Sequence, residues 1–274
     1  MVKKRFLAWG CGVQSTTLAA MSALGELEPL DAVITADTGW ERQVTYELRD
    51  GYTEWLRDQG VRVEVVTAGH IRRLGAETTL RLPFWTDSGG PLRRECTRFF
   101  KVKPIRRRIR ELLGYDAHRP PHPPGGSCEL WIGISLDEWP RAKLSRVKYM
   151  VHRWPLLERR LTRRDCMDWL EAKGLPVPSR SACVCCPYRR ASEWLAMKED
   201  APEEFTEAIA FDEWNRRNPL AWRDRKGLEA EALYLYQGGV PLAEADLEGD
   251  AARERQRYGI QIPMFLCESG YCWI

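Results

Sequence analysis

Hydrophobic and polar positions along the first 66 residues switch between the period of a strand and that of a helix. Short apolar runs at Phe6–Trp9 and Leu30–Ala36, and an alternating run at Val61–Val66, predict three strands. Between them, residues 16–24 and 45–59 carry apolar side chains at helical spacing, and a glycine closes each segment. This alternation of strands and helices predicts a parallel sheet with right-handed crossovers.

The later part of the chain continues this pattern and then becomes helical. The apolar run Glu129–Ile134 predicts a fourth strand, and residues 162–173 have the spacing of an amphipathic helix. Residues 68–94 lose periodicity, which predicts a long loop or a small hairpin. Beyond Tyr188 the spacing is helical again, with helices expected at 192–199, 203–217 and 227–237.

Two domains are expected from this change of pattern. Residues 1–180 predict an α/β nucleotide-binding domain with a doubly wound, mostly parallel sheet. Residues 181–274 hold a cysteine motif and the later helices, which we expect to pack on the sheet as a helical C-terminal cap. A chain of 274 residues is long enough for one large domain with such an addition.

Composition narrows the functional class only slightly. Hydrophobic residues make up 44% and charged residues 30% of the chain, which is typical of soluble globular proteins. The sequence shows neither an apolar run of membrane-spanning length nor a signal-peptide pattern, so we expect a cytoplasmic protein without membrane contact. Nine clustered cysteines favour a reduced compartment and metal or redox chemistry over a disulfide scaffold.

The turn after the first strand has the features of a phosphate-binding loop. Gly10 and Gly12 permit positive φ angles and a close approach of the backbone to a ligand. Ser15 and Thr16 place hydroxyls where the helix begins, beside free amides that bind anions. The loop lacks the Gly-Lys-Ser/Thr of a Walker A motif, and Ser15 replaces the third glycine of the dinucleotide fingerprint. An ordinary strand-to-helix turn remains the alternative.

A second turn, Asp37-Thr38-Gly39, follows the second strand, where doubly wound sheets bind their ligands. An acidic residue at this place suits a ribose or a magnesium ion. The alternative is a helix that begins here with Thr38 as its N-cap.

Basic residues are concentrated in two stretches. The first surrounds Cys96 and includes Arg98 and Lys101, with only Glu95 interrupting the positive charge before Glu111. The second comprises Lys143, Arg146, Lys148, Arg153, Arg159, Arg160, Arg163 and Arg164. Each is either a solvated face or a surface for an anionic partner, and a nucleic acid would suit both.

The cysteine motif Cys183-Val184-Cys185-Cys186-Pro187 is a candidate metal site. Two thiolates at Cys-x-x-Cys spacing reach one metal centre from a single turn. A redox dithiol, a zinc site and an iron–sulfur cluster are the three alternatives, and the redox motif lacks its usual preceding strand. Cys96, Cys267 and Cys272 are candidates for the remaining ligands, whereas Cys128 and Cys166 are typical of buried thiols.

These motifs together resemble the PP-loop ATP pyrophosphatases of the adenine-nucleotide α-hydrolase superfamily, and among them the PAPS reductase-like proteins. The resemblance runs from residue 5 to about residue 200. Gly12, Val13 and Ser15 match the PP-loop pattern, whereas Gly10, Cys11 and Gln14 depart from it. The other matching segments, in family order, are Asp37-Thr38-Gly39, the order Cys96-x4-Lys101-x-Lys103-Pro104, Gly133 to Arg141, and the Cys-x-x-Cys-Pro motif.

The resemblance implies ATP and Mg²⁺ as ligands and assigns roles to single residues. It implies a pyrophosphate cradle of Gly10, Gly12, Val13, Gln14, Ser15 and Thr16, with Asp37 and Thr38 at the rest of the nucleotide. It implies catalytic roles for Ser15, Asp37, Arg98, Lys101 and Arg141. It also implies a [4Fe-4S] cluster held by Cys96, Cys183 and Cys186, with Cys272 as a fourth ligand. Zn²⁺ at the same cysteines remains the alternative.

The expected reaction is therefore adenylation of an acceptor, with loss of pyrophosphate, followed by sulfur insertion. A nucleic acid is the expected acceptor, as in DNA phosphorothioation or RNA thiolation, and a cysteine desulfurase is a suitable sulfur donor. A homodimer is compatible with the sequence. Two alternatives remain, a sulfonucleotide reductase of the PAPS or APS type and a zinc-stabilised nucleic-acid-binding module.

Overall fold

The computed structural model describes residues 3–74, 82–87, 89–218 and 230–258. The chain forms two compact units. The first contains the described residues of 3–68 and 97–181, and the second those of 69–96 and 182–258. The crossings after residues 68 and 96 flank the aperiodic stretch 68–94, and the crossing after residue 181 comes directly before the cysteine motif.

The first unit is built on a five-stranded sheet in which every strand is parallel to its neighbours. The spatial order is β3-β2-β1-β5-β6. The strands are β1 (Lys4–Ala8), β2 (Ala32–Asp37), β3 (Val63–Thr67), β5 (Cys128–Ile132) and β6 (Met150–Arg153). The predicted α/β class with a doubly wound parallel sheet is confirmed. β6, at the edge, was not predicted.

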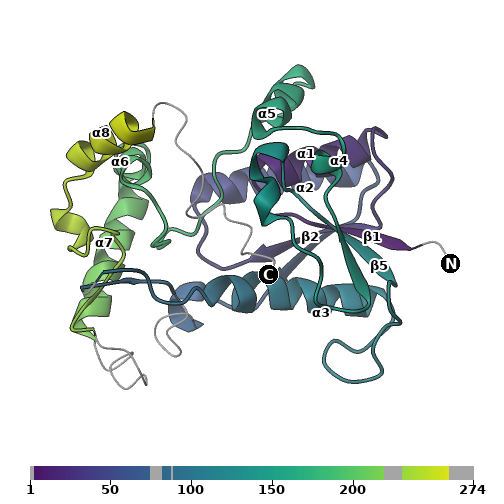
Figure 1. The fold of residues 1–274 in the computed structure, drawn as a ribbon, viewed down its shortest axis with the longest axis horizontal. Helices are drawn as coiled ribbons and strands as arrows, with labels where there is room; N and C mark the ends of the chain where they lie inside the picture. Colours follow the sequence, from purple (N-terminus) through teal and green to yellow (C-terminus); the bar gives the residue numbers. More distant parts are fainter. Residues whose placement is uncertain (1–2, 75–81, 88, 219–229, 259–274) are drawn as a thin grey trace. The chain divides into compact units, whose positions relative to one another are not determined.

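Helices cover both faces of this sheet because the side chains of β1 alternate between two cores (Figure 1). Leu7 packs with residues of α1 (Val13–Ala23), α2 (Gln43–Asp58) and α5 (Arg163–Ala172). Phe6 packs on the opposite face, with residues of α3 (Lys103–Leu112). The helices predicted at 16–24, 45–59 and 162–173 are confirmed within a few residues.

The topology identifies one edge of the sheet as the place for a ligand. From β1 the chain moves outward through β2 and β3, and then returns to the other side of β1 as β5 and β6. The connections after β1 and β5 therefore diverge, and ligands of doubly wound sheets bind outside the carboxyl ends of strands at such a switch point. Three short elements lie at this edge: a π-helix at Thr97–Val102, a 3₁₀-helix at Leu136–Arg141, and α4 (Pro155–Glu158).

The second unit is mainly helical. It contains α6 (Ala191–Asp200), α7 (Pro202–Arg217), α8 (Leu247–Tyr258) and a two-stranded antiparallel pair of β4 (Trp85–Thr86) with β7 (Leu233–Tyr234). The helices predicted at 192–199 and 203–217 are confirmed. The helix predicted at 227–237 is wrong from residue 230 onward, because Leu233 and Tyr234 pair with a strand about 150 residues earlier in the sequence.

Buried polar contacts fix α7 to the segment after β7. The Asp212 carboxylate, 1% exposed, accepts hydrogen bonds from the amides of Leu235 (2.8 Å) and Leu242 (2.9 Å) and forms an ion pair with Arg216. No helix in the described ranges is long and apolar enough to cross a membrane.

Candidate active site at the carboxyl edge of the sheet

The loop between β1 and α1 has an unusual backbone. The residue with the left-handed conformation is Cys11, with φ of 56°, and not Gly10 or Gly12 as the sequence suggested. The two glycines instead leave space beside the backbone, because they have no side chain. A methyl group added at Gly10 or Gly12 would meet no atom of the described residues within 4 Å, so space is open beside the backbone at both positions.

Helix α1 begins directly at this space. Gly12 is its N-cap, and no described side chain caps the helix. The first amides of a helix have no intrahelical acceptor, so those of Val13, Gln14 and Ser15 are oriented for a ligand. The Ser15 hydroxyl shapes the turn: it accepts a hydrogen bond from the Gly10 amide (3.2 Å) and donates to the Gly12 carbonyl (3.2 Å).

Two residues of the predicted cradle have side chains inside the protein. Thr16 is fully buried, and its hydroxyl accepts a hydrogen bond from the Trp9 indole (3.0 Å). Val13 is 1% exposed and belongs to the core between the sheet and α1. These side chains hold the helix against the strand, so only the backbone of these two residues remains for a phosphate.

Gln14 joins the loop to the connection after β5. Its amide nitrogen donates to the Ser135 hydroxyl (3.4 Å) and to the Glu138 carboxylate (3.2 Å). Glu138 also forms an ion pair with Arg141. Burial raises the pKa of Glu138, although Arg141 opposes this shift. Position 14 carries an amide where the PP-loop pattern has an acid, and here the fold brings a carboxylate beside that amide.

Gly133 makes this approach sterically feasible. A methyl group at this position would lie 2.7 Å from the Ser15 nitrogen and 2.9 Å from its Cα atom. The chain leaving β5 therefore touches the first turn of α1, and only glycine fits at the contact.

The Asp37-Thr38-Gly39 turn forms a second network. The Asp37 carboxylate accepts hydrogen bonds from the Gly39 amide (2.7 Å), the Tyr46 hydroxyl (3.0 Å) and Arg49 (3.2 Å). Thr38 is fully buried and donates to Glu41. The alternative in which Thr38 caps a helix is wrong, because α2 begins at Gln43 with Arg42 as its N-cap.

The three bases predicted to meet phosphates have different surroundings. Lys101 forms an ion pair with Glu41 (3.2 Å), and Arg141 is paired with Glu138 as described. Arg98 is exposed, and no acidic residue of the described ranges forms an ion pair with it. Glu41 and Glu138 were not among the predicted site residues, because their partners lie about 60 and 124 residues away in the sequence.

Buried side-chain nitrogens without a partner form a further feature of this unit. His152 (Nε2), Trp154 (Nε1) and Arg106 (Nε) each bury a nitrogen that has no hydrogen-bond partner among the described residues. The His152 and Trp154 rings lie 6.4 Å apart between centroids. Burial lowers the pKa of His152, which favours a neutral ring. His152 Nδ1 donates to the Lys143 carbonyl (2.9 Å), so Nε2 of the neutral ring is an acceptor, whereas the Trp154 and Arg106 nitrogens are donors. Buried polar atoms without partners are rare, so these nitrogens are suited to polar atoms of a ligand or to ordered water.

The cysteine motif lies in the second unit together with Cys96. A turn closed by a hydrogen bond from the Cys186 amide to the Cys183 carbonyl (3.1 Å) joins the two ends of Cys-x-x-Cys. The Trp85 indole donates to the Pro187 carbonyl (2.7 Å), and Arg94 lies over the Tyr188 ring, so the segment before Cys96 and the segment after Cys186 approach each other. Cys183 and Cys185 are buried, whereas Cys96 and Cys186 are half-buried.

A metal ligand set is not complete in this region. Among the residues that the structure describes, no three histidine, cysteine, aspartate or glutamate side chains are grouped so that they hold a metal ion. This includes Cys96, Cys183 and Cys186. Cys267 and Cys272 lie outside the described residues. The cysteines predicted to be ordinary thiols, Cys128 and Cys166, are indeed fully buried, and burial raises the pKa of each to about 12.

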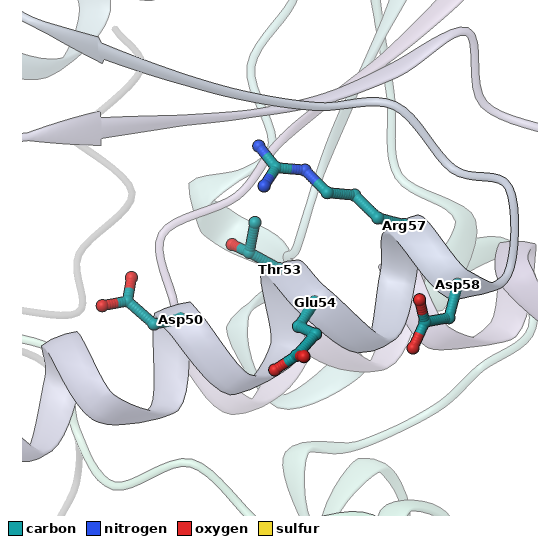
Figure 2. Close-up of a pocket in the computed structure, with 5 residues that line it drawn as sticks. All are labelled: Asp50, Thr53, Glu54, Arg57 and Asp58. Atoms are coloured by element: carbon teal, nitrogen blue, oxygen red, sulfur yellow. The ribbon is translucent and has the colours of Figure 1, made fainter.

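A pocket on α2 has a different character (Figure 2). Asp50, Glu54 and Asp58 project from successive turns of this helix, with Thr53 and Arg57 beside them. Three carboxylates in one pocket repel a polyphosphate, so this surface is not a nucleotide site.

No protein-family model matches the chain, and no curated protein sequence matches it. Solved structures similar to it include phosphoadenylyl-sulfate (PAPS) reductase from Candida auris in a phosphate complex. That match has 12% identity, covers 65% of this chain and 76% of the reductase, and has a TM-score of 0.42. Another is the U34-tRNA thiolase NcsA from Methanococcus maripaludis with its [4Fe-4S] cluster. It has 13% identity, covers 78% of this chain and 72% of the thiolase, and has a TM-score of 0.41. These are similarities of fold.

Proposed function

We propose that this protein is a PP-loop ATP pyrophosphatase and sulfurtransferase, which adenylates an acceptor so that sulfur can be inserted. The loop between β1 and α1 carries the proposal. It combines uncapped amides at the start of α1 with open space at Gly10 and Gly12, at the switch point of a doubly wound sheet. A phosphate group fits such a place because it accepts hydrogen bonds from amides and carries the charge that the helix dipole favours.

In the proposed reaction, an acceptor oxygen attacks the α-phosphorus of ATP and loses its proton. The bond from that phosphorus to the bridging oxygen breaks, and pyrophosphate leaves with both bonding electrons. Hydrosulfide, which a thiol releases from the donor's persulfide while a disulfide forms, then displaces AMP from the adenylated acceptor. The first step builds negative charge on the leaving pyrophosphate, so nearby cations stabilise its transition state.

Arg98, Lys101 and Arg141 are the proposed cations. Arg98 is exposed at the start of the π-helix. Lys101 and Arg141 are held by Glu41 and Glu138, which fix their positions before ATP binds. Because these cations are already in position, little reorganisation is needed when negative charge develops on the leaving pyrophosphate. Ser15, with its hydroxyl at the turn, orients the cradle.

The chemistry of Asp37 fits a role toward a magnesium ion or a ribose. A carboxylate has about four acceptor positions, and three protein donors use three of them. Magnesium in nucleotide sites takes one or two carboxylates, with phosphates and water completing its shell. One remaining position on Asp37 is sufficient for that arrangement.

No step of this proposal passes through an iron–sulfur cluster. The three described cysteines of the predicted set do not form a metal site by themselves. The proposed source of sulfur is a separate donor, such as a cysteine desulfurase. The proposed acceptor is a nucleic acid, in a DNA phosphorothioation or RNA thiolation reaction, and the basic stretch 143–164 supports that part.

The test is a pair of glycine-to-alanine variants. Gly12→Ala places a methyl group in the space proposed for the pyrophosphate, where it meets no described atom of the free protein. The Gly12 φ and ψ angles of −100° and 170° suit alanine, so this variant is expected to fold. Gly51→Ala is the matched control, since Gly51 is exposed on α2 and its added methyl group also meets nothing.

We expect Gly12→Ala to keep its stability but to bind ATP at least tenfold more weakly and to release less pyrophosphate. Gly51→Ala should bind and react as the parent does and be more stable by about 0.5–1 kcal/mol, because alanine is the better helix former. Calorimetric ATP titration and a pyrophosphate assay give the two readouts. Unchanged ATP binding in Gly12→Ala contradicts the proposal, as does sulfite release from a sulfonucleotide without any turnover of ATP.

A further inference from the structure

The segment after β5 exposes large apolar side chains directly beside the proposed active site. Trp139 is 65% exposed, Leu144 80%, Val151 42% and Leu136 39%. The exposure of Trp139 differs from that of Trp131 and Trp194, which are fully buried in the protein interior. A tryptophan costs free energy when it faces water, so its exposure at this place calls for a partner.

The same segment is basic beyond Trp139. Residues 136–151 contain four lysines and arginines, Arg141, Lys143, Arg146 and Lys148, and two acids, Asp137 and Glu138, which both precede Trp139. Arg141 and Arg153 are paired with carboxylates. Arg146 and Lys148 are exposed and form no ion pair within the described ranges, and Lys143 is exposed beside Leu144. The apolar side chains are therefore separated by positive charges instead of forming one continuous apolar patch.

This surface is connected to the proposed ATP site through adjacent residues. Ser135 and Glu138 contact Gln14 of the loop, and Trp139 is the next residue along the 3₁₀-helix. A molecule bound to Trp139 therefore lies next to the residues that hold the loop.

We propose that residues 136–151 bind an unpaired stretch of nucleic acid, with the Trp139 ring stacked on a base and Lys143, Arg146 and Lys148 at the phosphates. That this strand is the acceptor for adenylation rests on the proposed function. Stacking on an aromatic ring requires a base whose face is free, which favours single strands, loops and bulges over a duplex. Of the two acids beside Trp139, Glu138 is buried and paired with Arg141, and Asp137 accepts a hydrogen bond from the Arg163 amide (2.9 Å). The exposed cations that follow Trp139 in the sequence match a nucleic acid better than a basic protein surface.

Binding of fluorescently labelled oligonucleotides in the absence of ATP tests the proposal. We expect single-stranded RNA or DNA to bind more tightly than a duplex of the same sequence. Trp139→Ala should weaken single-strand binding about tenfold at every salt concentration, and Trp139→Phe should restore most of it. Arg146→Gln and Lys148→Gln should each lower the slope of log K against log salt by about one unit.

Two control variants remove matched groups far from this segment. Leu24→Ala shortens an apolar side chain that is 41% exposed at the end of α1. Arg62→Gln removes an exposed charge, paired with Glu64 (2.6 Å), just before β3 at the amino end of the sheet. Both are expected to bind oligonucleotides as the parent does.

The proposal is overturned if Trp139→Ala binds single strands as tightly as the parent, or if no oligonucleotide binds. The proposal is also overturned if a duplex binds as tightly as a single strand and Trp139→Ala does not change that affinity, because charge alone would then explain the binding. Capture of an acidic protein that Trp139→Ala no longer binds would assign the surface to a different partner. Strand binding without any pyrophosphate release would leave this surface in place and refute the ATP reaction instead.

Discussion

Cys11 has a left-handed backbone conformation, which residues other than glycine rarely adopt. It lies where the chain turns from β1 into α1. Its φ angle is 56°, and its thiol lies 3.6 Å from the Thr35 hydroxyl inside the protein. Such left-handed residues cost free energy and are found where a loop must present its backbone to a ligand. Burial raises the pKa of this thiol to about 12.

Three buried thiols predict a decline of stability in alkaline solution. The pKa of Cys11, Cys128 and Cys166 rises from 9.0 to about 12 on burial. Between these values the unfolded chain has released protons that the folded chain still holds, so the free energy of unfolding falls as pH rises. Well below pH 9 the three thiols are protonated in both states and contribute no slope.

Urea denaturation between pH 8 and pH 10.5 measures this effect. The double variant Cys128→Ala, Cys166→Ala should be less stable at pH 8 but lose less stability toward pH 10.5 than the parent. An identical slope in both proteins would show that these thiols ionise at similar pH in the folded and unfolded chains.

At the scale of single residues, the sequence predicted the turn between β1 and α1 but not the side chains that contact it from distant segments. The turn at Gly12 and Ser15 depends on neighbouring residues, so a short stretch of sequence is sufficient to predict it. The pairing of Gln14 with Glu138, and of Lys101 with Glu41, depends on the order of strands in the sheet. That order follows from packing between distant segments, which no short pattern records.

Between elements, the contact of the β5 exit with α1 predicts a strong effect of one methyl group. Gly133→Ala would place its Cβ 2.7 Å from the Ser15 nitrogen, so either the loop or α1 must shift. We expect a loss of about 1–3 kcal/mol in the free energy of unfolding, the usual cost of overpacking, together with weaker ATP binding.

Gly125→Ala is the control for this variant, because its Cβ would make an ordinary contact with the Lys148 carbonyl at 3.7 Å. Thermal and urea melts of the two variants give the comparison. Equal stability would mean that the contact at Gly133 is looser than described.

The start of α5 offers a second test at this scale. Thr162 caps the helix in a capping box with Asp165: each accepts a hydrogen bond from the backbone amide of the other, Thr162 at 3.2 Å and Asp165 at 2.8 Å. Thr162→Ala should lower the free energy of unfolding by about 1 kcal/mol. Thr206→Ala, on an exposed face of α7, should change it by less than about 0.5 kcal/mol. Equal losses in urea denaturation would argue against the capping role.

Elements with strong local patterns were predicted, and those that depend on distant partners were missed. Residues 16–24 and 45–59 repeat apolar side chains at helical spacing over several turns. β6 has only four residues in a basic stretch, and α8 has few apolar residues, with Leu247 and Ala251 buried. The helix expected at 227–237 failed because β7 gains its hydrogen bonds from β4, across about 150 residues of sequence.

For the whole molecule, the division into two units predicts that damage to one unit spreads little to the sheet of the other. Asp212→Ala leaves two buried amides and Arg216 without their acceptor, at a cost of about 3 kcal/mol or more. Amide hydrogen exchange should accelerate in α6, α7 and α8 and stay slow in β1, β2 and β5. Glu213→Ala, which removes only an exposed pair with Arg217, is the control. Uniform acceleration in both units would show that the chain unfolds as one body.

The identity of the products from ATP tests the central claim most directly. With ATP, Mg²⁺ and a single-stranded acceptor, label in the α-phosphate should appear in AMP or on the acceptor, and label in the γ-phosphate in pyrophosphate. Both products should decline together in Gly12→Ala. Formation of ADP and inorganic phosphate, or an absence of ATP turnover with every acceptor and sulfur donor supplied, would contradict the account.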